Sequence, residues 1–427
     1  MNQPNEPLNM LAPTSFRNAL SRRALFRAGG AAAGLVVIAA CGSDSKASPT
    51  TAGGATTIAG ETTTAGGVTT TAAASGDLLS QYSNVVNKSK GTLAMFTWGD
   101  YNDPEIVGSL ANADLGVTMK VDYYPSNEDL ITKLSAANGN SGYDIVVPTG
   151  PFIPQMIQKG LLQKFDKAKM PNIVNVDPLY LGQAWDKGNE YSVCKDWGST
   201  GWIYDKTKIT KEIKTWNDFI AACQGPGSGR CSVLDAPVNL AGMYFWANGI
   251  DWSTEKKEDL DAYEKFIVEE FASHIKSFDS YPSTAIAEGQ YDISMAWNGD
   301  ARQAFNRIKD AGGNPDNWVW GLGAPDTELW MDNYTIPVGA PNPDAAHAWI
   351  NWLLTPEISI KDLTYHGYHS GMKQIDKLIA KLVPDLQRPE MIFFTDDQVK
   401  TMHTSAVNSA QDRLVAVLDK AKAKAAG

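Results

Sequence analysis

The chain has 427 residues, which is too long for one ordinary hydrophobic core, so two domains or lobes are expected. The composition is that of a globular protein rich in aromatic residues, with 13 Trp and 15 Tyr, and most of these rings are expected to fill cores. The net charge of −11 disfavours nucleic acid and anionic lipid surfaces as partners.

Residues 1–40 are predicted to be an export signal. The basic stretch SRRALFR is followed by small or apolar residues from Ala28 to Ala40, a run shorter than the roughly 20 residues that span a bilayer. Arg22 and Arg23 resemble a twin-arginine signal. The sequence IAAC, which ends at Cys41, resembles a lipoprotein cleavage motif and implies a lipid on the Cys41 sulfur. The alternative is an ordinary cysteine behind a signal peptide.

Residues 41–89 are predicted to form a flexible tether behind the lipid anchor. Residues 42–76 are almost entirely Ser, Thr, Ala and Gly, and they have too few large apolar side chains to offset the entropy lost on ordering. The mean reach of such a segment is on the order of 30 Å. A domain on this tether would stand clear of the outer face of the cytoplasmic membrane, in a periplasm or at the cell surface.

Strand-like and helix-like segments alternate from about residue 90 onward, which predicts an α/β fold. The strands are expected at residues 91–98, 119–124, 143–148 and 334–337. The helices are expected at residues 126–138, 342–356 and 405–424. Ser126 or Asn127 and Asn342 are the expected caps, and Pro356 is expected to end the second helix.

The cysteines beyond the signal suggest one disulfide and no metal site. Cys223 and Cys231 flank the loop QGPGSGR, which can bring its ends together, and a bridge between them would stabilise the fold by roughly 2–3 kcal/mol. Cys194 is expected to be a small buried residue. There is no CxxC pair, and His366 and His369 lie in the loop-like YHGYH, so neither a metal nor a cofactor is expected.

Trp330 and Asp332 are two residues apart, directly before strand-like residues. Alternate residues of a strand share a face, so the indole and the carboxylate are expected to point into the same space. The alternative is a surface acid beside a core ring. Trp185, Trp197, Trp246, Trp318 and Trp352 are expected to be packing residues.

Several motifs together resemble a known family. They are FTWGDY, YPSNEDLITKL, YDIVVPT, LLQKFDKAKMPNIVNVDP, MAWNGDARQAFNR and LWMDNYTIP, which follow one another between residues 96 and 337. Their order and spacing resemble the bacterial polyamine-binding proteins of ABC importers, the spermidine/putrescine group of extracellular solute-binding proteins. The resemblance covers nearly all of residues 90–427.

This resemblance implies a two-lobed periplasmic-binding-protein fold, similar to type II, with a ligand cleft between the lobes. Lobe 1 is expected to hold residues 90–197 plus 333–365, and lobe 2 residues 198–332 plus 366–427. The chain is expected to cross between the lobes near Trp197–Thr200 and Trp330–Tyr334.

A polyamine needs flat apolar walls for its methylene chain and acids where its charges end, which aromatic rings and carboxylates supply. The resemblance implies that the ligand-binding residues are Trp98, Asp100, Tyr101, Thr149, Asp235, Trp297, Asp300, Trp330, Asp332 and Tyr368. Asp332 matches the principal amine-binding acid of the family. Asp100 and Asp300 also suit ordinary turns.

Two positions depart from the family pattern. Pro151 stands where members usually carry a Tyr or similar group, so one ligand wall is expected to be missing or moved. Val238 stands where members carry Glu, which removes a carboxylate expected at one amine end. Asp100 or Asp300 could compensate, or the far end of the ligand is not a primary amine.

The sequence therefore predicts a non-catalytic, monomeric, lipid-anchored receptor that closes on a small cationic ligand and presents it to a membrane-embedded ABC permease. A different small organic ligand is one alternative. A secreted hydrolase using Asp300 and Asp332, or a purely structural surface protein, are the others. The sequence leaves open which amine is bound, how tightly, by which permease it is taken up, and whether the envelope has an outer membrane.

Overall fold

The structure, a computed structural model, describes residues 78–426, which belong to the compact unit Ser75–Gly427. The predicted signal, the lipid site at Cys41 and most of the predicted tether lie outside the described residues. Among the residues that are described, no helix is long and apolar enough to cross a membrane.

The strands of the described chain join in one eleven-stranded sheet. Its main path is β2-β1-β3-β10-β5-β8-β6-β7, with β4 and β11 also pairing with β10 and β9 pairing with β5. The strands are β1 (Gly91–Thr97), β2 (Val117–Tyr123), β3 (Ile145–Val146), β4 (Leu162–Gln163), β5 (Ser192–Asp205), β6 (Cys231–Val233), β7 (Ile275–Phe278), β8 (Ile293–Trp297), β9 (Trp318–Leu322), β10 (Thr327–Pro337) and β11 (Met402–His403).

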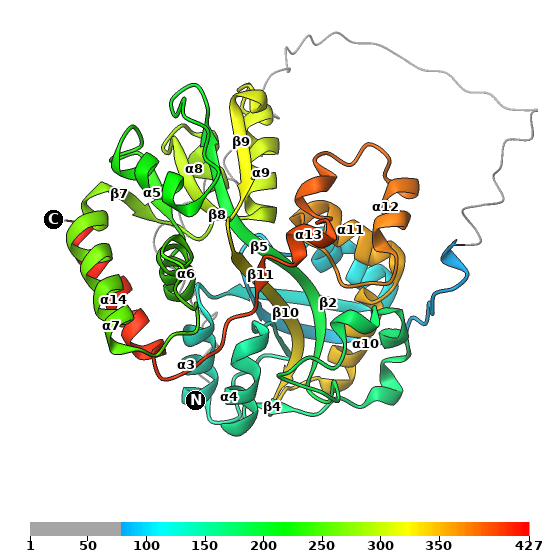
Figure 1. The fold of residues 1–427 in the computed structure, drawn as a ribbon. Coiled ribbons are helices and arrows are strands. Elements are labelled where there is room, and N and C mark those ends of the chain that lie inside the picture. The colour runs from blue at the N-terminus through cyan, green and yellow to red at the C-terminus, as the bar shows by residue number, and fades with distance from the viewer. Residues whose placement is uncertain (1–77, 427) are drawn as a thin grey trace, which may run out of the picture. The chain divides into compact units, whose positions relative to one another are not determined.

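Two long antiparallel strands, β5 and β10, connect the two halves of this sheet (Figure 1). In one half, β1 pairs in parallel with β2 and β3, and β10 runs antiparallel to β3. In the other half, β6 pairs in parallel with β7 and β8, while β5 runs antiparallel to β8 and β9. The predicted crossings at Trp197–Thr200 and Trp330–Tyr334 fall within β5 and β10.

Helices cover the faces of this sheet (Figure 1). The α-helices are α3 (Asn127–Ala137), α4 (Ile153–Gln158), α5 (Trp216–Gln224), α6 (Pro237–Ala247), α7 (Lys257–Lys265), α8 (Ser283–Ala287), α9 (Asn298–Asp310), α10 (Pro343–Leu353), α11 (Pro356–His366), α12 (Ile375–Leu382), α13 (Asp396–Val399) and α14 (Gln411–Ala425). Two π-helices are η1 (Ile106–Leu115) and η6 (Phe266–Phe271). Short 3-10 helices are η2 (Gly150–Phe152), η3 (Lys167–Lys169), η4 (Pro171–Asn175), η5 (Pro178–Tyr180), η7 (Ala272–His274), η8 (Pro315–Asn317) and η9 (Pro389–Met391).

The predicted helices form, with shifts at their ends. The Ser126 hydroxyl accepts a hydrogen bond from the Asp129 amide at 3.1 Å and caps α3, as its sequence predicted. Helix α10 follows Asn342 but ends at Leu353, and Pro356 opens α11 instead of ending α10. Helix α14 begins at Gln411, six residues later than predicted.

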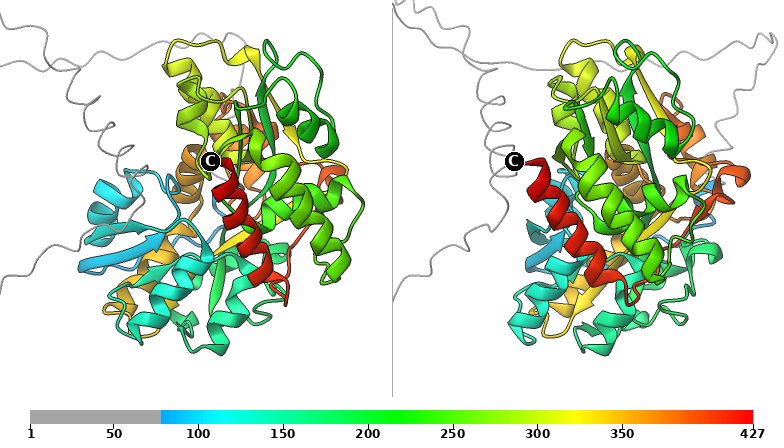
Figure 2. Two further views of the ribbon diagram at one scale, coloured as in Figure 1. Left: turned by 90° about the vertical axis from the view of Figure 1, so that its left-hand side faces the viewer. Right: turned by 60° about the vertical axis from the view of Figure 1, so that its left-hand side comes forward.

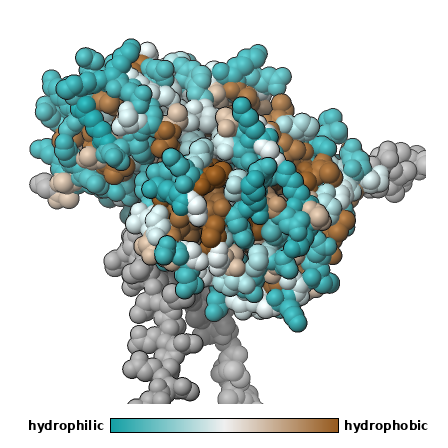
Figure 3. Space-filling view, turned by 90° about the horizontal axis from the view of Figure 1, so that it is seen from below, coloured by the Kyte–Doolittle hydropathy of each residue, from teal (hydrophilic) through white to brown (hydrophobic). Residues whose placement is uncertain are grey.

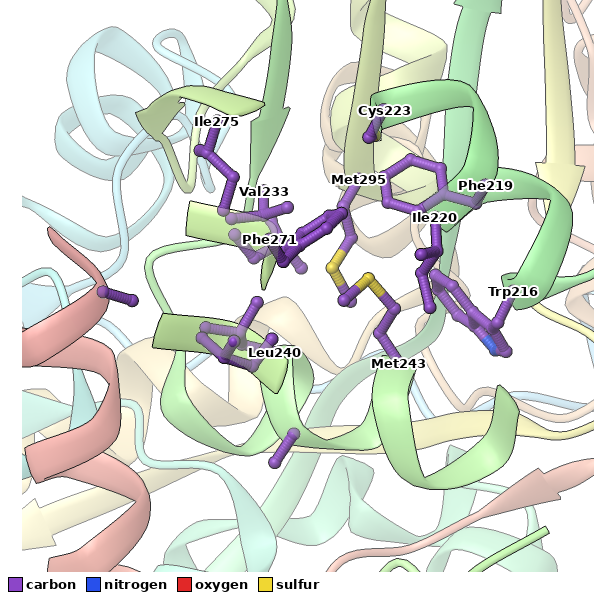
Figure 4. Packing of buried hydrophobic residues seen from close by; sticks show 14 of the residues in the cluster. Trp216, Phe219, Ile220, Cys223, Val233, Leu240, Met243, Phe271, Ile275 and Met295 are labelled. Carbon is purple, nitrogen blue, oxygen red and sulfur yellow. The ribbon is translucent and has the colours of Figure 1, made fainter. Parts of the chain in front are cut away.

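Each half of the sheet has its own hydrophobic core. In the half built on β6 to β8, Met243 from α6 and Met295 from β8 meet beside Phe271 and Trp216 (Figure 4). The other half packs Trp349 and neighbouring residues of α10 against β1 and β10. The packing prediction holds for Trp197, Trp246 and Trp352, which are buried, while Trp185 and Trp318 are half-buried against core clusters.

Helix α14 packs along α6 and β7 and reaches the opposite half of the sheet (Figure 2). The Gln411 side chain donates to the Glu128 carboxylate of α3 at 2.7 Å. The segment after α11 contacts the first half instead, because the backbones of Gly371 and Lys373 pair with Asp177 and Asn175. The lobe boundaries stay a prediction, and these contacts favour moving the segment near Gly371 into lobe 1.

The disulfide predicted from the sequence is absent from the structure. Cys223 and Cys231 are both buried thiols, and they lie close enough for a side-chain hydrogen bond between them. Burial raises the pKa of the Cys223 thiol well above its ordinary value. Cys194 is buried, as predicted.

Much of the surface is hydrophilic, as the acidic composition leads one to expect. One face shows mainly polar side chains, with apolar ones visible near its middle (Figure 3). Among the described residues the large apolar side chains with the greatest exposure are Leu179 and Val174, close together in the chain.

Candidate ligand-binding site

A cavity lies beside β10, where the two halves of the sheet meet. Three alternate residues of β10, Glu328, Trp330 and Asp332, line it and share one face of the strand. Trp98 follows β1 and Trp297 ends β8, so each half contributes a ring from the carboxyl end of a parallel strand. Ligand sites in α/β proteins commonly lie at these strand ends.

The structure brings most of the predicted site residues together. Nine of the ten line this cavity: Trp98, Tyr101, Thr149, Asp235, Trp297, Asp300, Trp330, Asp332 and Tyr368. Asp100 does not line it, and its carboxylate pairs with Arg307 at 3.0 Å. Its φ of 55° is typical of a turn residue, which was the alternative interpretation. Direct contact between a ligand and the nine residues stays a prediction.

The cavity wall combines acids with aromatic rings. Its five acids are Glu128, Asp235, Asp300, Glu328 and Asp332. Its seven rings belong to Trp98, Tyr101, Phe152, Tyr281, Trp297, Trp330 and Tyr368. Among the described residues, none of those lining the cavity is Lys, Arg or His. Such a wall attracts cations and repels anions.

The rings from the two halves approach one another across the cavity. The centroids of Trp98 and Trp297 are 6.4 Å apart, edge to face. Trp330 and Tyr368 form a second edge-to-face pair at 4.8 Å. The Trp98 indole is held in place because its N–H donates to the Val147 carbonyl at 3.0 Å. These contacts give the cavity rigid, flat walls.

Asp332 has a carboxylate oxygen that is free to accept a hydrogen bond from a ligand. One of its oxygens, Oδ2, accepts from the Tyr101 hydroxyl at 2.7 Å. The other, Oδ1, is buried and has no hydrogen-bond partner among the described residues, and the same holds for the indole nitrogen of Trp330. Burial is the main reason that the pKa of Asp332 rises to about 7, and the nearby Asp196 adds to the effect.

The Tyr101 hydroxyl lies between two carboxyls, because it also contacts Asp196. A hydroxyl has one proton to donate, so one of these carboxyls must hold a proton for both contacts to be hydrogen bonds. Lys195 is 2.7 Å from Asp196 and favours the charged form of that residue. The two carboxyls thus compete for the Tyr101 proton, and Asp332 is the one without a cation beside it.

Lys195 serves a buried network that lies behind Tyr101. Besides Asp196, its ammonium faces Asp362 at 3.6 Å and lies 3.7 Å from the centre of the Tyr101 ring. His366 is 3.4 Å from Asp196, but burial lowers its pKa well below the ordinary value, so it contributes no charge. Lys195 is thus the cation of this network.

Asp300 and Glu328 resemble Asp332 in lacking a basic partner. Asp300 accepts from the Tyr368 hydroxyl, and Glu328 accepts from the Thr200 hydroxyl at 2.8 Å and from the Asn239 amide. In the described part of the chain no Lys or Arg forms an ion pair with either of them. Burial raises the pKa of each to about 7.

Asp235 lines the cavity but already has a cation. Its carboxylate is 2.5 Å from the ammonium of Lys422 in α14, and both side chains are about one-third exposed, at 33% and 38%. No local sequence pattern indicated this pairing, because Asp235 and Lys422 are far apart in the chain. Asp235 therefore offers a ligand less unneutralised charge than Asp332 does.

Sequence reasoning missed several residues of the cavity wall, notably Glu328, Tyr281, Asn239 and Glu128. The wall expected to be missing at Pro151 is supplied one residue later, by Phe152. Val238 lines the cavity as an apolar residue, and a carboxylate from β10, Glu328, lies beside its neighbour Asn239.

The described residues contain no group of three His, Cys, Asp or Glu side chains that could hold a metal ion. His366 ends α11 and His369 lies in the loop that follows, where it accepts from the Trp197 indole at 2.9 Å. The acids and rings that line the cavity suit the binding of an organic cation.

Comparison with known proteins assigns the family. Residues 108–384 match the family described as bacterial extracellular solute-binding protein. This match spans more than half of the chain. The chain belongs to the bacterial extracellular solute-binding proteins. Proteins of this family are non-catalytic components of transport, so this solute-binding protein is not an enzyme.

Individual relatives agree with the resemblance drawn from the motifs. The solute-binding protein is 28% identical to the putrescine/agmatine-binding protein of Pseudomonas aeruginosa over 298 residues, which are 67% of this chain and 80% of the relative. It is 28% identical to the spermidine/putrescine-binding periplasmic protein of Salmonella typhimurium over 313 residues, 69% of this chain and 84% of the relative.

Solved structures confirm the predicted α/β binding-protein fold. A putative spermidine/putrescine ABC transporter from Listeria monocytogenes matches with a TM-score of 0.69 at 23% identity, covering 78% of this chain and 98% of that one. A lipoprotein of Treponema pallidum matches with a TM-score of 0.64 at 23% identity, covering 77% and 99%.

Proposed function

We propose that this protein is the substrate-binding lipoprotein of an ABC importer and that it captures a polyamine. One observation carries the proposal: the cavity wall described above holds five acids and seven aromatic rings but no basic side chain. Each ammonium over a ring gains about 0.5–2 kcal/mol, and each carboxylate contact adds a charge-assisted hydrogen bond. The aliphatic chain of the ligand lies against the flat rings.

Capture works by closure of two lobes and not by bond-making. Rings and acids come from both halves of the sheet, with Trp98 and Tyr101 on one side and Trp297 on the other. A ligand that touches both sides binds the closed form better than the open form and so shifts the population toward closure. The closed monomer then docks on a membrane permease, while a lipid on Cys41 keeps it near that partner outside the cytoplasm.

The names of the relatives support this ligand class. Proteins named for binding putrescine, agmatine or spermidine recur among them, at 24% to 28% identity. Identity at this level supports the class of ligand and does not select one member of it. The choice among amines rests on the cavity itself.

A thermal-shift panel of amines, amino acids and sugars tests the proposal. Putrescine or spermidine should raise the melting temperature in a concentration-dependent way, because a ligand that binds only the folded state stabilises it by mass action. Recovery of unchanged ligand from the mixture is the expected companion result. Stabilisation by a sugar or an anionic solute, with none by any amine, would overturn the proposal.

A different small organic cation is the second candidate, and the pairing of Asp235 with Lys422 favours it. This pairing and the apolar Val238 leave fewer charged contacts on one wall than a symmetric diamine would use. Stabilisation by a mono-cation that exceeds the effect of every polyamine in the same panel would select this candidate.

A further inference from the structure

The acids of β10 stand at both ends of an indole. Glu328, Trp330 and Asp332 occupy alternate positions of one strand, so all three side chains leave the same face. Four residues of strand separate the Cα atoms of the two acids by about 13 Å. The cavity therefore contains an acid, a flat ring and a second acid in line along one strand.

Hydrogen bonds hold the two carboxyls toward opposite halves of the sheet. Asp332 bonds to Tyr101, which follows β1. Glu328 bonds to Thr200 of β5 at 2.8 Å and to Asn239 of α6. These partners belong to different halves, so the carboxyls do not converge on one point.

Glu328 has the features of a cation-binding acid. It is only 7% exposed, it lines the cavity, and no Lys or Arg of the described chain forms an ion pair with it. Hydrogen bonds from the neutral side chains of Thr200, Asn239 and Trp297 fix its position without matching a charge. A buried carboxylate in this state is costly until a cation arrives, and burial accordingly raises its pKa to about 7.

Asp235, another acid on this side of the cavity, is less suited to this role. Asp235 is already matched by Lys422 at 2.5 Å and is one-third exposed. Asp300 of α9 also lacks an ion-pair partner in the described chain, but it lies off the strand that carries Trp330 and Asp332. Glu328 is thus the unmatched acid of this half that shares a strand face with that ring and that acid.

We propose that Glu328 receives a second cationic group of the ligand, at the opposite end of Trp330 from Asp332, and that the site consequently selects a linear amine longer than a four-carbon diamine. This inference rests on the proposed function, because it assumes that the cavity takes an aliphatic amine. A middle ammonium, as in a triamine, would lie over the Trp330 ring and gain cation–π attraction.

Calorimetric titration of the intact protein with a series of α,ω-diamines from four to eight carbons, and with spermidine, tests the length preference. The wild-type affinity should rise with chain length beyond four carbons, and spermidine should bind at least tenfold more tightly than putrescine. A maximum at four carbons would overturn the inference. Absence of binding by every amine would instead overturn the proposed function.

The variant Glu328→Gln isolates the carboxylate, because Gln can still accept from Thr200 and Asn239. It should bind spermidine about tenfold or more weakly and putrescine within about threefold of wild type, which removes the length preference. The matched control is Glu212→Gln, an exposed acid that pairs with Lys214 outside the cavity, and it should change neither affinity. Equal losses for both amines in Glu328→Gln, or no loss, would remove Glu328 from this role.

Discussion

Two groups of buried carboxyls meet at the Tyr101 hydroxyl, and they differ in where their counter-charge comes from. Behind Tyr101, Asp196 and Asp362 face the buried ammonium of Lys195. In the cavity, Asp300, Glu328 and Asp332 have no ion-pair partner in the described part of the chain, and burial raises the pKa of each to about 7. The first group has a cation of its own, while the second needs a cation from outside.

The buried network around Lys195 supports the cavity in front of it. Charge in the rear group is fixed, so Tyr101 is held in one orientation and presents its hydroxyl to Asp332. A buried pair contributes little net stability, but removing one partner leaves an uncompensated charge. In the cavity, Asp300, Glu328 and Asp332 already carry the free-energy cost of buried carboxyls without a matching cation, and a bound ligand cation would reduce it.

Removal of the internal cation should have the largest effect. Lys195→Met leaves Asp196 and Asp362 buried without their partner, so the free energy of unfolding should fall by about 3–5 kcal/mol. Urea denaturation measures this change. Lys214→Met, which breaks an exposed pair with Glu212, is the control and should leave the midpoint unchanged. A Lys195→Met protein of wild-type stability would break the distinction between the two groups.

Removal of a cavity acid should act on the ligand instead. Asp332→Asn deletes a charge-assisted contact, so amine affinity should fall tenfold or more, or about 1.4 kcal/mol and above. Stability without ligand should not fall, since Asn removes a buried group that has no matching cation. Calorimetry and denaturation on the same preparation separate the two effects. Unchanged affinity would take Asp332 out of the site.

The pH dependence should reveal the protons held by the cavity acids. In the folded protein the pKa of each of these acids is about 7, above the ordinary values of 3.8 and 4.5. At a pH between those ordinary values and 7, the folded state therefore binds more protons than the unfolded state. Stability of the ligand-free protein should therefore fall as pH rises from about 4 to about 7. Amine affinity should rise severalfold from about pH 6 to pH 8, because ammonium binding needs charged carboxylates.

Denaturation midpoints across this window, in wild type and in Asp332→Asn, check the stability part of that prediction. The variant should show a shallower decline, because one of the titrating groups is gone. A stability that increases steadily from pH 4 to pH 7 in the ligand-free protein would show that these carboxyls are charged and matched.

The smallest effect is expected at the acid that carries its own cation. Asp235→Asn removes a carboxylate that Lys422 already pairs with, so amine affinity should change by less than about threefold. Lys422→Met gives the complementary test, because it should make Asp235 available and raise the affinity. Titration of both variants would place Asp235 with one group or the other.

The sequence predicted the part of the site that depends on local spacing. Trp330 and Asp332 share a face because strand residues alternate, and the structure places both in the cavity. The same spacing applies to Glu328, two residues before Trp330. It was missed because the strand was expected to begin at residue 334, whereas pairing with β5 and β11 extends β10 back to Thr327.

The remainder of the site depends on partners that are distant in the chain. Arg307 forms an ion pair with Asp100, and Lys422 forms one with Asp235. No local sequence pattern identifies either partner. The bounds of α3 and the cap at Ser126 are local properties and were predicted well. The proximity of Cys223 and Cys231 followed from the loop that they flank.

Asp300, Glu328 and Asp332 have no cation partner in the described part of the chain, and a ligand is expected to supply one. Calorimetric titration with spermidine at pH 7, in two buffers of different ionisation enthalpy, measures the protons released on binding. Spermidine should bind tightly with net proton release, and this release should be smaller in Asp332→Asn. Binding with no dependence on the buffer, or stronger binding of an anionic solute, would contradict it.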